Sequence, residues 1–106
     1  MTKILQKTKE LLETGWTRER AAVDQAGQPV PWISQEAVAW SLVGAVKRAQ
    51  YELRSDHLFW AMVSTIAAGL EHTGDPMGSL LVWNRDATQT EVLALVTKAI
   101  ARECTV

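Results

Sequence analysis

The sequence predicts an all-α protein, an orthogonal bundle of four to five helices with a small hairpin-like insertion after the first helix. Two observations carry this prediction. Several segments repeat apolar residues at intervals of three and four, which is the spacing of one helix face. A stretch rich in turn-forming Asp, Gly and Pro follows the first of these segments. Because 106 residues is a usual length for one domain, we assign residues 1–106 to a single helical domain.

The first helix is expected over residues 2–14. Its inward face follows the helical period and consists of Ile4, Leu5, Thr8, Leu11 and Leu12. Gly15 should end the helix in a left-handed conformation, and Trp16 should fold back onto the core. Asp24–Gly27 has the composition of a tight turn, flanked by 21–23 and 29–30, which predicts a short hairpin with an edge strand.

A second helix is expected from Ser34, as N-cap, to residue 50 or 51. Its small residues would let a neighbouring helix approach closely: Ala37, Ser41, Gly44 and Ala45. A third helix should restart at Ser55-Asp56 and end at 72–76, with the inward stripe Leu58, Phe59, Met62, Val63, Ile66, Ala67 and Leu70. The apolar run 77–83 is too short for periodicity to decide between a helical turn and a strand, and we favour a short helix because a helix cap follows it. The capping box Thr88–Glu91 opens a last helix that reaches about Glu103.

Composition restricts the classes of function. The chain is 47% hydrophobic with a net charge of −1, which is typical of a globular protein without a strong positive field, so we expect no nucleic-acid partner. No apolar run suits a signal peptide or a membrane span. The single cysteine, Cys104, fits a reducing compartment. The sequence therefore predicts a cytoplasmic protein that does not bind membranes.

Residues that could carry chemistry are few. His57 and His72 would lie more than ~20 Å apart on one helix, so they cannot share a metal ion. Cys104 is close to the C-terminus, where a reactive site is hard to hold. There is no nucleophile elbow and no phosphate-binding loop. We assign no catalytic residue, cofactor or metal, and the sequence leans against an enzyme without deciding the question.

Five tryptophans are the unusual feature of the composition. Trp16, Trp40 and Trp83 are expected to fill the core. Trp60, by contrast, lies off the stripe of the third helix, beside Ser64 and Ala68, and an exposed tryptophan is a favoured interface anchor. Trp32 lies in the Pro-rich loop. The four residues proposed for an interface are therefore Trp32, Trp60, Ser64 and Ala68, and a second copy of the chain is one candidate partner.

A second candidate site is the polar segment Asn84-Arg85-Asp86, directly before the N-terminus of the last helix. Unpaired N–H groups at such a terminus attract an anion or carboxylate. The alternative is a purely capping role, because Thr88 and Glu91 would already satisfy these groups.

The order of short motifs resembles a small bacterial and phage family of unknown function. The matching pieces are Gly15-Trp16-Thr17, Asp24–Val30, Glu36–Trp40, Gly44-Ala45, Trp83-Asn84 and Thr90–Leu95. The resemblance implies the fold and brings no established activity.

We therefore predict an accessory or regulatory protein that acts through protein–protein contacts, with a phage or mobile-element origin implied by the resemblance alone. One alternative is a small-ligand-binding protein or minor enzyme. The other is a DNA-binding regulator, although a recognition helix needs base-reading polar residues, and the third helix turns Leu58, Phe59 and Met62 to the core.

Overall fold

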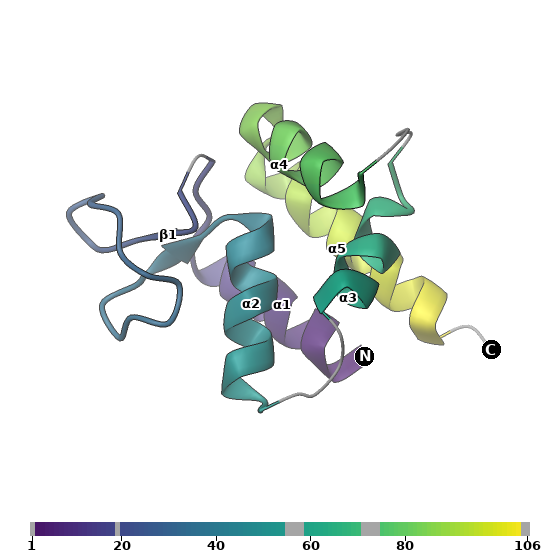
Figure 1. Ribbon diagram of the computed structural model, residues 1–106, viewed down its shortest axis with the longest axis horizontal. Coiled ribbons are helices and arrows are strands. Elements are labelled where there is room, and N and C mark those ends of the chain that lie inside the picture. Colours follow the sequence, from purple (N-terminus) through teal and green to yellow (C-terminus); the bar gives the residue numbers. More distant parts are fainter. Residues whose placement is uncertain (1, 19, 55–58, 71–74, 105–106) are drawn as a thin grey trace.

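The computed structural model describes residues 2–18, 20–54, 59–70 and 75–104 (Figure 1). This part of the chain is mostly helical, as expected, but it is not purely α, because a two-stranded antiparallel sheet is present. The elements are α1 (Thr2–Thr14), β1 (Ala22–Val23), β2 (Ala39–Trp40), α2 (Leu42–Glu52), α3 (Phe59–Ala67), α4 (Pro76–Asp86) and α5 (Gln89–Cys104). None of these helices is both long and apolar enough to cross a membrane.

Helix α1 has the predicted bounds and the predicted inward face. It packs mainly against α2 and α5. Thr8 is a polar member of the buried face, and its hydroxyl donates to the Ile4 carbonyl oxygen at 2.7 Å. That bond within the helix satisfies a hydroxyl that would otherwise be buried without a partner.

The expected conformation of Gly15 is wrong, although the helix does end beside it. Gly27 is the one glycine with positive φ in the described chain. At Gly15 an added Cβ would instead collide with the Val38 carbonyl oxygen. The chain runs past β2 here, since Thr17 N donates to Trp40 O at 3.1 Å and Trp40 N donates to Gly15 O at 3.2 Å. Close backbone approach, not a left-handed turn, is what requires glycine at this position.

The predicted turn at 24–27 is present. Asp24 Oδ1 accepts hydrogen bonds from the backbone N–H groups of Ala26 and Gln28, both at 2.9 Å. Gly27 has φ of 79°, the left-handed value that glycine tolerates best. The returning arm is short, because Val23 forms a single bridge with Pro29. The regular partner of β1 is β2, in the register Ala22 opposite Trp40.

The predicted start of the second helix, at Ser34, is wrong. Helix α2 begins at Leu42, and its N-cap is Ser41, whose Oγ accepts from Gly44 N at 3.1 Å. Ser34 instead stabilises a local turn by accepting from Glu36 N. Residues 37–40 are apolar enough for a buried helix or a buried strand, and pairing with β1 makes the last two of them, Ala39 and Trp40, a strand.

Gly44 is needed for close packing, as predicted, but against a different neighbour. The group that an added Cβ would meet is the Ala21 carbonyl, next to β1, and not another helix. Ala21 O also accepts from Ser41 N at 3.2 Å, which holds the segment against the start of α2. The small residue therefore lets the sheet, not a helix, lie on α2.

The last helix agrees with the prediction, but the predicted end of the third helix, at 72–76, is wrong. Helix α3 ends at Ala67, and residues 68–70 form a turn, in which Gly69 N donates to Ile66 O at 3.2 Å and Leu70 N donates to Ala67 O at 2.9 Å. Helix α3 buries Met62, Val63, Ile66 and Ala67, while its predicted start at Ser55-Asp56 lies outside the described residues. Helix α4 is present and longer than expected. The capping box of α5 is formed reciprocally: Thr88 N donates to Glu91 Oε1 at 3.0 Å, and Glu91 N donates to Thr88 Oγ1 at 3.2 Å.

Candidate functional site

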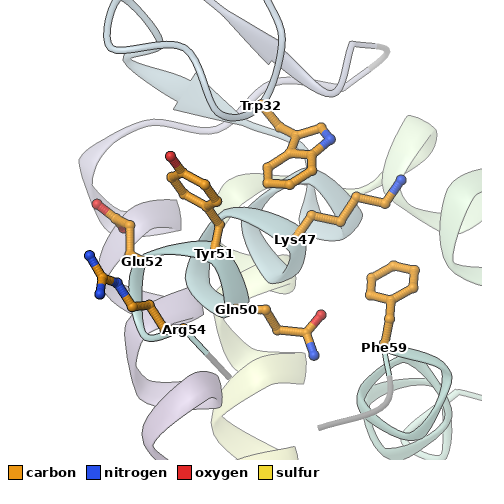
Figure 2. A pocket seen from close by; sticks show the side chains of 7 residues that line it. All are labelled: Trp32, Lys47, Gln50, Tyr51, Glu52, Arg54 and Phe59. Carbon is orange, nitrogen blue, oxygen red and sulfur yellow. The ribbon is translucent and has the colours of Figure 1, made fainter. Parts of the chain in front are cut away.

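An open groove of about 780 Å³ lies between α2, the start of α3 and the loop that carries Trp32 (Figure 2). We call it the aromatic groove. Its lining residues are Trp32, Lys47, Gln50, Tyr51, Glu52, Arg54 and Phe59. Lys47, Gln50 and Tyr51 are spaced i, i+3 and i+4, so one face of α2 supplies the floor.

Three aromatic rings form the walls of the aromatic groove. Trp32 and Tyr51 meet edge to face, with ring centroids 6.1 Å apart. Phe59 stands across from them, and the Lys47 side chain extends between the Trp32 and Phe59 rings (Figure 2). The Lys47 ammonium is 5.4 Å from the Phe59 ring centroid, within the range of a cation–π contact. Because Tyr51 is 58% exposed, much of this aromatic surface is available to a ligand.

The loop that carries Trp32 is fastened to α2 by Arg48. The guanidinium Nη1 donates to the carbonyl oxygens of Trp32, at 3.0 Å, and Ser34, at 2.8 Å. The same guanidinium lies 5.6 Å from the Trp40 ring centroid. A second donor, Trp40 Nε1, reaches Trp32 O at 3.3 Å. Trp32 is thus half-buried and held in place within the Pro-rich loop, where the sequence suggested an exposed tryptophan.

Positive charge predominates in the aromatic groove. Lys47 and Arg54 have no ion-pair partner among the described residues. The one acidic residue of the lining, Glu52, already faces two cations, with Arg48 Nε at 3.6 Å and Lys7 Nζ at 3.8 Å. Among the described residues, the groove therefore combines two cations that have no ion-pair partner with an exposed ring, Tyr51, and two half-buried ones, Trp32 and Phe59.

A smaller pocket of about 230 Å³ adjoins the aromatic groove and shares Lys47 with it. Arg18, Arg20 and Leu81 also line this second pocket. Leu81 is 49% exposed, although it is a large apolar residue. The combination of exposed apolar side chains and cations therefore continues from the groove onto the neighbouring surface.

Trp60 extends the aromatic surface on the α3 side. It is 57% exposed, and its ring centroid is 6.2 Å from that of Phe59. Ser64 on α3 and Ala68 just after its end are exposed as well, so the indole has small side chains beside it. The sequence identified Trp60 and Trp32. It missed Tyr51 and Lys47, whose i, i+4 spacing beside Trp32 becomes meaningful only once the loop packs on α2.

Asn84, the first residue of the polar segment 84–86, has a structural role. Asn84 is only 2% exposed. Its Oδ1 accepts from Trp16 Nε1 at 2.8 Å and from Leu42 N at 3.3 Å. Its Nδ2 donates to the carbonyl oxygens of Thr17, at 3.3 Å, and Arg18, at 2.8 Å.

These four bonds use the full hydrogen-bonding capacity of the Asn84 amide, which leaves none for a ligand. Arg85 and Asp86, the other members of the segment, are exposed. Asn84 therefore caps the first turn of α2, whereas the N-terminus of α5 is capped by Thr88 and Glu91.

Residues considered for metal binding or catalysis fall mostly beyond what the structure describes. His57, His72 and the Cys104 side chain lie outside the described residues. Within residues 2–18, 20–54, 59–70 and 75–104, no three His, Cys, Asp or Glu residues are grouped as metal ligands would be.

Fold and groove together define a small, mostly helical protein with an exposed aromatic groove and basic side chains around it. The chain belongs to a family of unknown function (DUF6197), whose model matches residues 1–102. This match confirms that the ordered motifs mark a small family without an assigned activity. No curated protein and no solved structure matches the chain.

Proposed function

We propose that this protein is an accessory or regulatory protein that binds a partner protein through the aromatic groove and the adjoining Trp60. The observation that carries the proposal is the gathering of four aromatic residues from three segments of the chain. Trp32 and Phe59 are half-buried beside Lys47, and Tyr51 and Trp60 are exposed next to them. Aromatic residues are enriched where proteins bind each other, and tryptophan and tyrosine dominate binding energy there. The single cysteine supports a cytoplasmic setting.

Rigid support for the rings strengthens this proposal. Trp32 is held by Arg48 and Trp40, and Phe59 is half-buried against the core. Anchors that are fixed before binding lose less conformational entropy when a partner arrives. The exposed face is therefore preorganised in its centre and open at Tyr51 and Trp60.

Site-specific photocrosslinking in the native host tests the proposal. A photoreactive amino acid at Ser64, which is exposed beside Trp60, should capture a discrete protein. The same group at Thr97, an exposed position on α5, is the matched control and should not capture it. Adding Trp60→Ala or Tyr51→Ala to the Ser64 probe should abolish the crosslink. Equal capture from both positions, or capture insensitive to these substitutions, would contradict a partner site at the groove.

A small planar anion is a second candidate ligand, favoured by the size of the aromatic groove. About 780 Å³ falls within the volume range of ligand sites, and the walls combine rings with two cations. A panel of nucleotides and aromatic carboxylates can be screened by thermal shift. A ligand of the groove should raise the Tm of the parent and leave that of Tyr51→Ala unchanged.

A further inference from the structure

We infer that the segment of the partner that enters the aromatic groove is acidic and carries an apolar anchor side chain, with its carboxylates against Lys47 and Arg54 and its anchor among Trp32, Tyr51 and Phe59. This inference rests on the proposed function, because it specifies the chemistry of the partner. It depends on the charges around the groove and on the backbone of Arg54.

The charges select an acidic segment. Lys47 and Arg54 lie within the groove, and Arg18 and Arg20 line the adjoining pocket. Among the lining residues the structure assigns to either hollow, Glu52 is the one acid, and it already faces Arg48 and Lys7. Because interfaces match positive surface with negative surface, an acidic segment gains attraction where a basic one meets repulsion.

The placement of Lys47 gives the segment a path. Lys47 lines both the groove and the adjoining pocket, so a bound segment that continues past Lys47 would contact both. An anchor in the groove would then be followed by carboxylates near Arg18 and Arg20.

The backbone of Arg54 supports a role for its charge. Arg54 follows the end of α2 with φ of 50°, the left-handed region in which glycine is the usual residue after a helix. An arginine there is strained and contributes no ion pair within the described residues. A long cation at a position that favours glycine is explained if its side chain binds something outside the chain.

Selection of peptides on the purified, full-length protein tests the inference directly. The probe is a random 12-residue peptide library displayed on phage, eluted by competition and sequenced. The enriched peptides should combine Asp or Glu with Trp, Phe or Leu. Their affinity should fall roughly tenfold for Lys47→Glu and for Tyr51→Ala, and it should also fall as salt is raised. Lys98→Glu, at an exposed position of α5, should change it less than about twofold.

Arg54→Gly separates an effect on peptide binding from an effect on folding. It relieves the strained backbone, so Tm should be kept or raised, while affinity for the same peptides falls. Retained affinity in Arg54→Gly and Lys47→Glu, or enriched peptides without acidic residues, would overturn the acidic inference. If those peptides still lost binding in Tyr51→Ala, the proposed function would stand.

Two further outcomes separate the remaining possibilities. If no enriched peptide is sensitive to Tyr51→Ala, the proposed function itself fails, and the inference fails with it. A single-stranded oligodeoxythymidine that competes for the groove, binds more tightly than any peptide and is lost in Lys47→Glu would overturn the inference in favour of nucleic acid.

Discussion

The Asn84 side chain accepts a hydrogen bond from the indole N–H of Trp16 at 2.8 Å, joining two residues that are 68 positions apart in the chain. Asn84 lies on α4, and its other bonds reach residues 17 and 18 and the first N–H of α2. One amide thus connects α4, the segment after α1 and the start of α2. Ser41 and Asn84 also line the pocket beside the aromatic groove. The hydrogen bonds of Asn84 therefore hold the start of α2, the helix that supplies the floor of the groove, in place against α4.

Replacing Asn84 with alanine should lower the free energy of unfolding by about 2–4 kcal/mol, because several buried donors and acceptors lose their partner. Urea denaturation followed by tryptophan fluorescence measures the change. Arg85→Ala, the exposed neighbour, is the matched control and should stay within about 0.5 kcal/mol of the parent. A parent-like midpoint for Asn84→Ala would mean that water replaces the amide.

Gly44→Ala should destabilise the protein by about 1–3 kcal/mol, although alanine is the better helix former. The added methyl would collide with the Ala21 carbonyl oxygen and lie 3.0 Å from its carbon. Backbone at this distance cannot move aside without disturbing the β1–β2 pairing.

Gly78→Ala is the control for Gly44→Ala, because it too lies in a helix. Its added methyl would meet Asp75 Oδ2, the end of a flexible side chain, at 3.3 Å. Thermal unfolding should therefore change by less than ~1 kcal/mol for Gly78→Ala. Similar melting curves for both variants would contradict the tight contact at Ala21.

Much of the fold could be predicted because its signals are local. The apolar stripe of α1 and the capping box of α5 depend on residues within a few positions of each other. Residues 37–40 could not be assigned in the same way. Their apolar run suits helix or strand equally, and the deciding bonds come from β1, about sixteen residues earlier.

The candidate site was only partly predictable for the same physical reason. Trp60 departs from the stripe of its own helix, so its exposure follows from helical periodicity. The aromatic groove forms between the loop at Trp32, α2 and α3, and no spacing in the sequence specifies that meeting. Asn84 shows the converse case, since a polar residue expected at a surface is buried by partners from residues 16–18 and 42.

Arg48→Met should loosen the loop that carries Trp32 while keeping an aliphatic stem over Trp40. The variant loses the charged donor to two carbonyl oxygens, for which a cost of about 2 kcal/mol is expected. Amide hydrogen exchange should accelerate in peptides that cover residues 30–38. Lys47→Met is the control, because Lys47 directly precedes Arg48 on α2 but has its cation–π contact with Phe59. It should leave hydrogen exchange in residues 30–38 unchanged. Equal exchange in both variants would argue against Arg48 as the fastening residue.

Trp60→Ala should leave the fold intact, because 57% of this residue is exposed and its loss opens no core cavity. The free energy of unfolding is expected to change by less than about 0.5 kcal/mol. Val63→Ala, three positions along α3 and fully buried, is the contrasting variant and should lose about 2 kcal/mol. Large destabilisation by Trp60→Ala would show that the indole belongs to the core.

The parent and Trp60→Ala together test whether the occupant of this face is a second copy of the chain. A twofold dimer through Trp60 would use the same surface on both chains, so the cations Lys47 and Arg54 of both chains would belong to one interface. Like charges in apposition oppose that pairing, so light scattering should give the mass of one chain for the parent and for Trp60→Ala at micromolar concentration. A dimeric parent that becomes monomeric in Trp60→Ala would instead identify the second copy as the partner. That dimer would have to tighten as salt is raised, because screening weakens the repulsion between the two basic surfaces.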